Sequence, residues 1–218
     1  DPYGLRRQAL GIIYIRLDKQ WHLSLEELID FALYIYVEEN GLAFDYKKVK
    51  ADILEFFQGR IRNMLMDVEK IRYDIVDAVL SSGIDDVYDL LQRANKLNSW
   101  LEREGLNEIL LAFNRVANIA AGSEKHEVKR ELFEEEEENK LYDKFNVVEE
   151  KADYYLQKKE YDKALDQLVT LREPIDNFFD KVMVMVDDED IRNNRLAVLQ
   201  KIYNMMISIC DLSKIVNK

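Results

Sequence analysis

The segment from residue 106 to 121 carries an arginine and an asparagine that could bind a ligand together. On a helix its apolar residues form one stripe, made of Leu106, Ile109, Phe113, Val116 and Ala120. Arg115 and Asn118, three residues apart, then project together from the opposite side. An Arg–Asn pair on one face can reach a phosphate or a base edge. The spacing therefore predicts either such a binding face or an ordinary solvated helix face.

Two further arginines stand at the beginning of the last apolar stripe, which consists of Leu199, Ile202, Met206 and Ile209. Arg192 and Arg195 are in line with this stripe rather than opposite it. Because an unpaired buried charge is costly, two interpretations remain open. Either they form internal ion pairs with acids such as Asp176, Asp180 or the run 187–190, or they face an anion where the core ends.

A cluster of aromatic and thioether side chains, Phe178, Phe179, Met183 and Met185, lies next to these arginines in the sequence. Such residues usually pack in a core, and we expect at least two of the four to do so. They could also supply a platform on which unstacked bases lie, as recognition of single-stranded RNA requires.

The sequence lacks the usual signatures of catalysis. It has no Gly-rich phosphate loop, no Ser/His/Asp or Cys/His set and no metal-ligand spacing. His22 and His126 are the only histidines and stand far apart. Cys210 is the single cysteine, so the chain can form neither an internal disulfide nor a cysteine zinc site, and it suits a reducing cytosol. We expect no catalytic and no metal-binding residues.

The composition indicates a helical globular protein. Seven Gly and two Pro in 218 residues exclude a collagen-like chain, a loop-rich β-sandwich and a Pro-rich linker. No stretch approaches the roughly 18 apolar residues of a membrane span. The 31 basic and 43 acidic residues give a net charge of −12, which by itself argues against a nucleic-acid binder.

Helical periodicity and end signals predict an all-α chain. Ser24 and Glu27 have the spacing of a capping box, and Asp74 is a candidate cap for a short helix. A loop and an acidic helix start are expected over 124–138. Val182 to Val186 has the composition of a strand but is too short to decide. The expected helices cover residues 1–18, 24–40, 45–72, 75–80, 85–104, 106–121, about 139–158, 161–171, a segment restarted by Pro174, and about 190–211.

The run from Tyr161 to Leu165 is similar to the second helix of a tetratricopeptide repeat. No second copy occurs at the 34-residue period of such arrays, which favours an ordinary helix crossing. Together with the acidic balance, the run leaves one alternative open: a helical protein–protein interaction scaffold without RNA binding.

The run Pro174 to Met185, followed by Arg192 to Leu196, resembles the C-terminal region of the beta subunit of bacterial glycyl-tRNA synthetase. Further matches fall in the right order, so the resemblance covers essentially the whole chain. They are the segments 1–7, 74–80 and 115–119, and Tyr161 with Ala164 and Leu165.

This resemblance implies a helical bundle with an arginyl-type (DALR-like) anticodon-binding domain at residues 46–218. Residues 1–45 would be the last helices of a preceding HD-like helical domain. The chain would be a fragment of the beta subunit of a cytoplasmic glycine–tRNA ligase, an assembly of two alpha and two beta subunits. It would bind tRNA-Gly but neither DNA nor a membrane. The resemblance places glycine, ATP and Mg at the alpha subunit, so we expect no cofactor and no catalysis in this chain.

The resemblance implies tRNA contacts at Arg115, Asn118, Arg192 and Arg195, with Phe179 and Lys181 as weaker candidates. Two departures stand out: Asn114 replaces an expected lysine, and the letters Asp-Ala-Leu-Arg are absent. The runs 134–138 and 187–190 hold nine of the twelve net negative charges. We therefore expect a small positive patch and a shallow dependence of tRNA affinity on salt.

Overall fold

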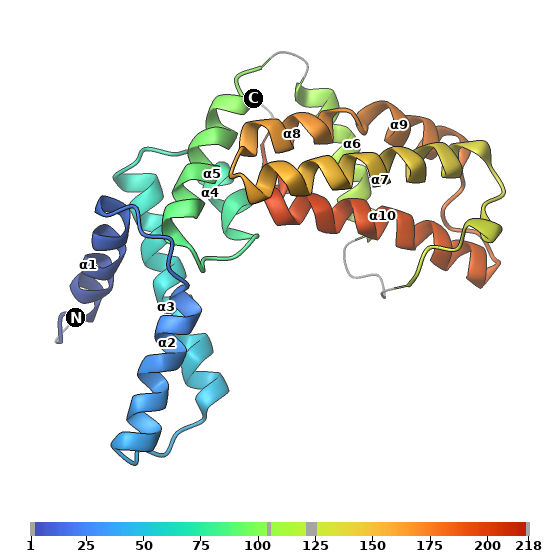
Figure 1. The fold of residues 1–218 in the computed structure, drawn as a ribbon. Coiled ribbons are helices and arrows are strands. Elements are labelled where there is room, and N and C mark those ends of the chain that lie inside the picture. The colour runs from blue at the N-terminus through green and yellow to red at the C-terminus, as the bar shows by residue number, and fades with distance from the viewer. Residues whose placement is uncertain (1–2, 104–105, 121–125, 217–218) are drawn as a thin grey trace. The chain divides into compact units, whose positions relative to one another are not determined.

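The computed structural model describes residues 3–103, 106–120 and 126–216, and within these ranges the chain forms helices and no strand (Figure 1). The prediction of an all-α fold is confirmed. The chain divides into two compact units, residues 1–95 and 96–218. The domain boundary expected between residues 45 and 46 falls inside the first unit, where α3 packs against both helices that precede it. The two-domain assignment itself stays a prediction.

The first unit contains α1 (Leu5–Asp18), α2 (Leu25–Tyr34), α3 (Tyr46–Asp67), α4 (Tyr73–Leu80) and the first part of α5 (Val87–Trp100). A π-helical turn, Ile35–Glu39, extends α2. The helix α3 packs against α1, α2 and α4, and its residues Ile61 and Leu65 are completely buried.

The ends of these helices test the predicted caps. Ser24 Oγ accepts the backbone N–H of Glu27 at 2.9 Å, as the capping-box spacing indicates. The predicted cap at Asp74 is wrong: α4 begins one residue before it, and Asp74 is buried and pairs with Arg72. The helix ends expected at residues 1, 104 and 121 lie outside the described residues.

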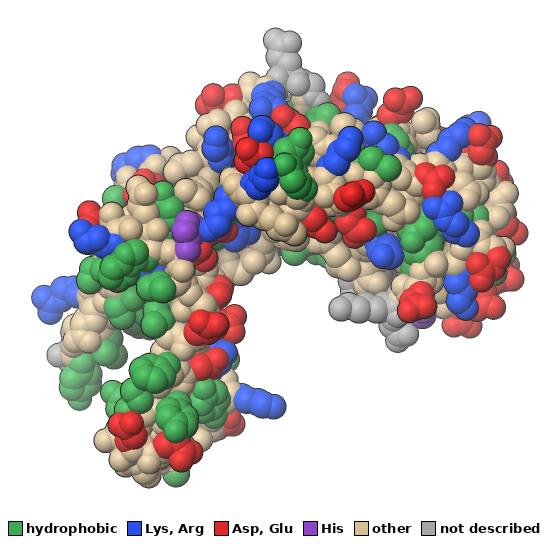
Figure 2. Space-filling model, viewed as in Figure 1, with side chains coloured by type: hydrophobic (Ala, Val, Ile, Leu, Met, Phe, Trp, Pro, Cys, Tyr) green, Lys and Arg blue, Asp and Glu red, His purple; other side chains and the backbone are tan. Residues whose placement is uncertain are grey.

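Many large apolar side chains of the first unit lie at its surface. They include Trp21, Phe31, Tyr34, Tyr36 and Leu42, and Phe31 is 65% exposed. Figure 2 shows hydrophobic groups on the surface of α1 to α3. Burying such area would be favourable, so this unit offers a surface suited to a protein contact.

The second unit contains α6 (Leu106–Ala120), α7 (Glu136–Gln157), α8 (Tyr161–Val169), α9 (Arg172–Lys181) and α10 (Glu189–Ile209), with short 3-10 turns at Arg130–Leu132 and Leu212–Lys214. The helix α7 packs against α8, α9 and α10, while α6 packs against α9 and α10. Phe113, Phe145 and Phe178 are fully buried in this unit. Pro174 lies in the first turn of α9, where a proline is tolerated.

Two of the remaining expectations concern loops. The acidic run does begin a helix, since Glu135 and Glu138 form a capping box at the start of α7. Val182 to Val186 forms a loop that bends at residues 184 and 185, not a strand. No helix in the described part of the chain is long and apolar enough to cross a membrane.

Candidate nucleic-acid interface

Arg115 lies on the surface that α6 and α9 share in the second unit. Its guanidinium Cζ lies 4.4 Å from the centre of the Phe179 ring. Its Nη1 is 3.6 Å from Asp176 Oδ1, and both side chains are substantially exposed, at 45% and 38%. An exposed ion pair of this length contributes little stability. The guanidinium is therefore held in place by an aromatic ring while its charge remains available to an anion.

Arg172 extends this cluster along α9, and sequence reasoning missed it. It pairs with Glu108 of α6, and its Nε lies 3.6 Å from Asp176 Oδ2. The i, i+4 spacing of Arg172 and Asp176 was readable in the sequence. The cluster holds two arginines and two acids, so an incoming phosphate would compete with Glu108 and Asp176 for the guanidinium groups.

The other candidates near this surface are exposed polar groups. Asn118 lies one turn beyond Arg115 on α6 and is exposed, so both can approach one ligand, as their spacing predicts. Lys181 is also exposed. It follows Pro174 and Asn177 at helical spacing, on a face of α9 different from that of Phe179.

Arg195 is buried and bonded to other groups of the protein, which argues against direct contact with a ligand. It is 3% exposed. Its Nε donates to Glu138 Oε1 at 3.0 Å, its Nη2 to Glu134 Oε2 at 2.9 Å and its Nη1 to the Met183 carbonyl at 3.1 Å. Burial alone would lower the pKa of Arg195, but the hydrogen bonds to Glu138 and Glu134 outweigh it and raise that pKa. For Arg195 the structure therefore supports an internal ion pair and not a side chain that faces an anion.

The partners of Arg192 and Arg195 differ from those expected in the sequence. Arg192 is half-buried and donates to the carbonyls of Val186 and Asp187, at 2.9 and 3.4 Å. Asp176, expected as a partner of these arginines, pairs instead with Arg115 and Arg172. Arg192 and Arg195 thus both bind the loop between α9 and α10.

The aromatic and thioether cluster divides between core and surface. Phe178 is fully buried and Phe179 half-buried, so one of the four lies in the core, fewer than the two expected. Met183 and Met185 are exposed by 73% and 59%. Among the described residues no group of three or more His, Cys, Asp or Glu could hold a metal ion.

Two protein families match parts of the chain. Residues 1–81 match the family described as "Glycyl-tRNA synthetase beta subunit", and residues 109–215 match the "DALR anticodon binding domain". The second match contains Arg115, Asn118 and Phe179. The resemblance expected from the sequence is confirmed.

Relatives match the chain along its length. A glycine–tRNA ligase beta subunit from Clostridioides difficile is 49% identical over 100% of the chain and 31% of the relative. Those from Desulforamulus reducens and Bacillus subtilis are 39% and 35% identical, over 99% and 100% of the chain. The chain therefore spans about a third of the length of these relatives.

Proposed function

Because the chain belongs to the glycyl-tRNA synthetase beta subunit family, we propose that it is a tRNA-binding portion of a glycine–tRNA ligase. Its residues 109–215 bind the anticodon arm of tRNA-Gly and position the tRNA for glycylation in the cytoplasm. The chain supplies binding and orientation. The reaction with glycine, ATP and Mg takes place at the alpha subunit.

One observation carries this proposal: Arg115 is held on the Phe179 ring, with its charge exposed, inside the segment that matches an anticodon-binding family. A guanidinium fixed in this way suits bidentate contact with a phosphate. Asn118, one turn away, carries both a donor and an acceptor for a base edge. Lys181, on another face of α9, is a weaker candidate for the RNA backbone.

The same proposal includes a protein partner. The alpha subunit is that partner, in an assembly of two alpha and two beta subunits. Exposed apolar side chains such as Phe31 and Tyr34 support a protein contact in the first unit. The alternative function, a scaffold that binds protein but no RNA, is disfavoured by the match of residues 109–215 to an anticodon-binding domain.

A titration of the chain with tRNA-Gly at two salt concentrations tests the proposal. Arg115→Ala should weaken binding about tenfold, since a hydrogen bond to a charged group contributes about 1.5–3 kcal/mol. The matched control is Arg130→Ala, because Arg130 also lies over a ring, that of Tyr142, and pairs with an acid. The control should bind like the wild type.

Circular dichroism should show that both variants are folded. If Arg115→Ala and Asn118→Ala both bind tRNA-Gly as tightly as the wild type, the α6 and α9 surface is not the binding site. If the folded wild-type chain binds tRNA-Gly no more tightly than an unrelated protein does, the proposed function itself is wrong.

A further inference from the structure

One face of α7 carries lysine, valine and tyrosine side chains at helical spacing. They are separated by four, three, four and three residues, which puts them in a single row. The row runs over about 21 Å at about 1.5 Å per residue. Its members are Lys140, Lys144, Val147, Lys151 and Tyr154. In an acidic chain this is a local concentration of positive charge on one helix face.

Lys144 and Lys151 have no partner for their charge within the part of the chain that the structure describes. Neither ammonium group makes a salt bridge or a hydrogen bond there. The cause is in the sequence, because the positions one turn away from them are held by lysine, leucine, valine and tyrosine rather than by acids. Lys140, by contrast, pairs with Glu136 at 2.8 Å.

The row borders two hollows that follow one another along α7. One, of about 400 Å³, lies against α8 and is lined by Val147, Glu150, Lys151, Tyr154, Tyr155 and Gln167. The other, of about 370 Å³, lies against α9 and is lined by Glu137, Lys140, Lys144, Thr170, Glu173, Pro174 and Asn177. Each has about the size of a small-ligand site. Three of the lining residues, Glu137, Glu150 and Glu173, are acids, and the amide and hydroxyl groups of the others could bond a sugar or phosphate.

Two tyrosines stand at the α8 end of this row. The Tyr154 ring is 52% exposed and packs edge-on against Tyr155, with ring centres 5.4 Å apart. Lys158 Nζ lies 4.3 Å from the centre of the Tyr154 ring and donates to its hydroxyl, which raises the pKa of Lys158. Lys163 lies over Tyr155 at 5.6 Å. Each of the two adjacent rings thus has one ammonium group near it.

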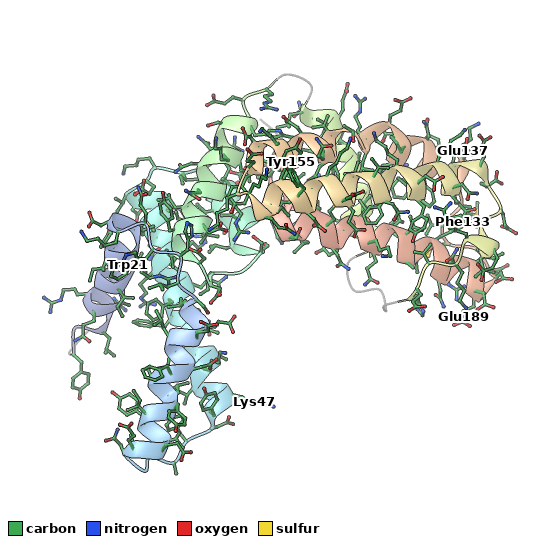
Figure 3. The ribbon with its side chains drawn as sticks, in the orientation of Figure 1. Trp21, Lys47, Phe133, Glu137, Tyr155 and Glu189 are labelled. Atoms are coloured by element: carbon green, nitrogen blue, oxygen red, sulfur yellow. The ribbon has the colours of Figure 1, made fainter. Side chains whose placement is uncertain are left out.

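The surface beside the row lies where α7 meets α8. Figure 3 labels Tyr155 where α7 and α8 run side by side, and Figure 2 shows basic side chains around hydrophobic ones in that region, with acidic ones between them. Lysines that follow a groove, with aromatic rings beside them, are typical of surfaces that bind single-stranded nucleic acid. An acidic protein segment would be attracted by the lysines but would gain less from an exposed tyrosine ring.

We propose that this face of α7, with its grooves against α8 and α9, binds a single strand of RNA. Lys144 and Lys151 contact phosphates, and a base stacks on Tyr154. The inference rests on the proposed function, because it assigns a second surface of the same chain to the same class of ligand. It adds contacts with the backbone that do not depend on the Arg115 surface.

The test measures binding of a labelled oligouridylate of about eight nucleotides and of tRNA-Gly. The double variant Lys144→Gln/Lys151→Gln should bind the oligouridylate about tenfold more weakly. The slope of log affinity against log salt should fall by about 1.4, since each phosphate contact with a single strand contributes about 0.7. The matched control with the same loss of charge is Lys47→Gln/Lys48→Gln, at exposed positions of α3. It should bind like the wild type.

Tyr154 supplies a second variant pair. Tyr154→Ala should weaken oligouridylate binding about tenfold through lost stacking. Tyr154→Phe keeps the ring and should stay within about twofold of the wild type. Lys151 and Tyr154 are exposed and Lys144 is half-buried, and circular dichroism should show unchanged folding for all variants.

Several results would overturn the inference. One is an affinity of Lys144→Gln/Lys151→Gln for both RNAs equal to that of the wild type. Another is displacement of the oligouridylate by polyglutamate as efficiently as by unlabelled RNA, which would indicate an acidic protein as the ligand.

The outcomes separate the two proposals. If Arg115→Ala weakens only tRNA-Gly while the α7 variant changes neither affinity, the proposed function stands and the α7 strand site is wrong. If the α7 variant loses affinity for the oligouridylate while Arg115→Ala leaves the affinity for tRNA-Gly unchanged, the strand site is supported and the Arg115 contact is wrong. A wild-type chain that binds neither RNA would contradict both.

Discussion

Replacement of Arg195 by alanine would remove the centre of a buried network in the second unit. The guanidinium makes hydrogen bonds to Glu138 at 3.0 and 3.3 Å, to Glu134 at 2.9 Å and to the Met183 carbonyl at 3.1 Å. Glu138 is only 1% exposed. The variant would therefore leave a carboxylate inside the protein without its counter-charge.

The expected cost follows from this geometry. Removal of one partner of a buried ion pair destabilises a protein by about 3–5 kcal/mol. The backbone N–H groups of Glu134 and Glu135 still donate to Glu138, both at 2.9 Å, so the lower half of that range is expected. At about 2–4 °C per kcal/mol for a chain of this size, the melting temperature should fall by about 6–16 °C.

Urea unfolding measures this loss through the fluorescence of Trp100, which is buried in the second unit, in a Trp21→Phe background. Arg195→Lys keeps the charge without the planar fork and should lose less stability than Arg195→Ala. Arg130→Ala, which breaks an exposed pair, should change the free energy of unfolding by no more than about 1 kcal/mol. If Arg195→Ala is as stable as the wild type but binds tRNA-Gly more weakly, Arg195 is a ligand contact and the structural interpretation is refuted.

Two further predictions concern the first unit. Ser24→Ala removes the cap on the Glu27 N–H and should lower the free energy of unfolding by about 1 kcal/mol, measured by urea unfolding. The hydrogen bond from Lys50 lowers the pKa of Asp30 below its ordinary value of 3.8. Its contribution to stability is therefore present above that ordinary value and is lost as pH falls through the lowered pKa. Asp30→Asn should lower the melting temperature at pH 7 but not below the lowered pKa, and an equal decrease at both pH values would contradict this assignment.

The sequence predicts much of the helical framework because its signals are local. The apolar stripe of α6 and the spacing of Ser24 and Glu27 depend on residues within a few turns of each other, and the structure has both. The cap at Asp74 failed because its carboxylate is buried and pairs with Arg72, two residues earlier. The helix starts at Tyr73, one residue before Asp74.

The pairing of Arg195 could not be read from the sequence. Glu138 lies 57 residues before it, in an acidic run that suggests solvent exposure. Only the capping box at Glu135 turns the Glu138 side chain inward.

The row on α7 is different, because its spacing is present in the sequence. What the sequence does not contain is the pair of grooves that α8 and α9 form beside that row.

The site around Arg115 likewise combines a local feature that the sequence predicts with a tertiary contact that it does not. Its spacing from Asn118 predicts a shared face, while its contact with the Phe179 ring depends on the packing of α6 against α9. The segment that joins these two helices in the sequence is more than fifty residues long, so no local pattern could indicate this contact.

The most direct test of the proposed function compares two tRNAs on the same folded chain. One is tRNA-Gly, and the other is tRNA-Gly with its three anticodon bases replaced. Because each wrong base in a specific site costs about 1–3 kcal/mol, the altered tRNA should bind at least about tenfold more weakly, and Arg115→Ala should weaken binding of both. Equal affinities for the two tRNAs, unchanged by Arg115→Ala, would contradict anticodon recognition by this chain.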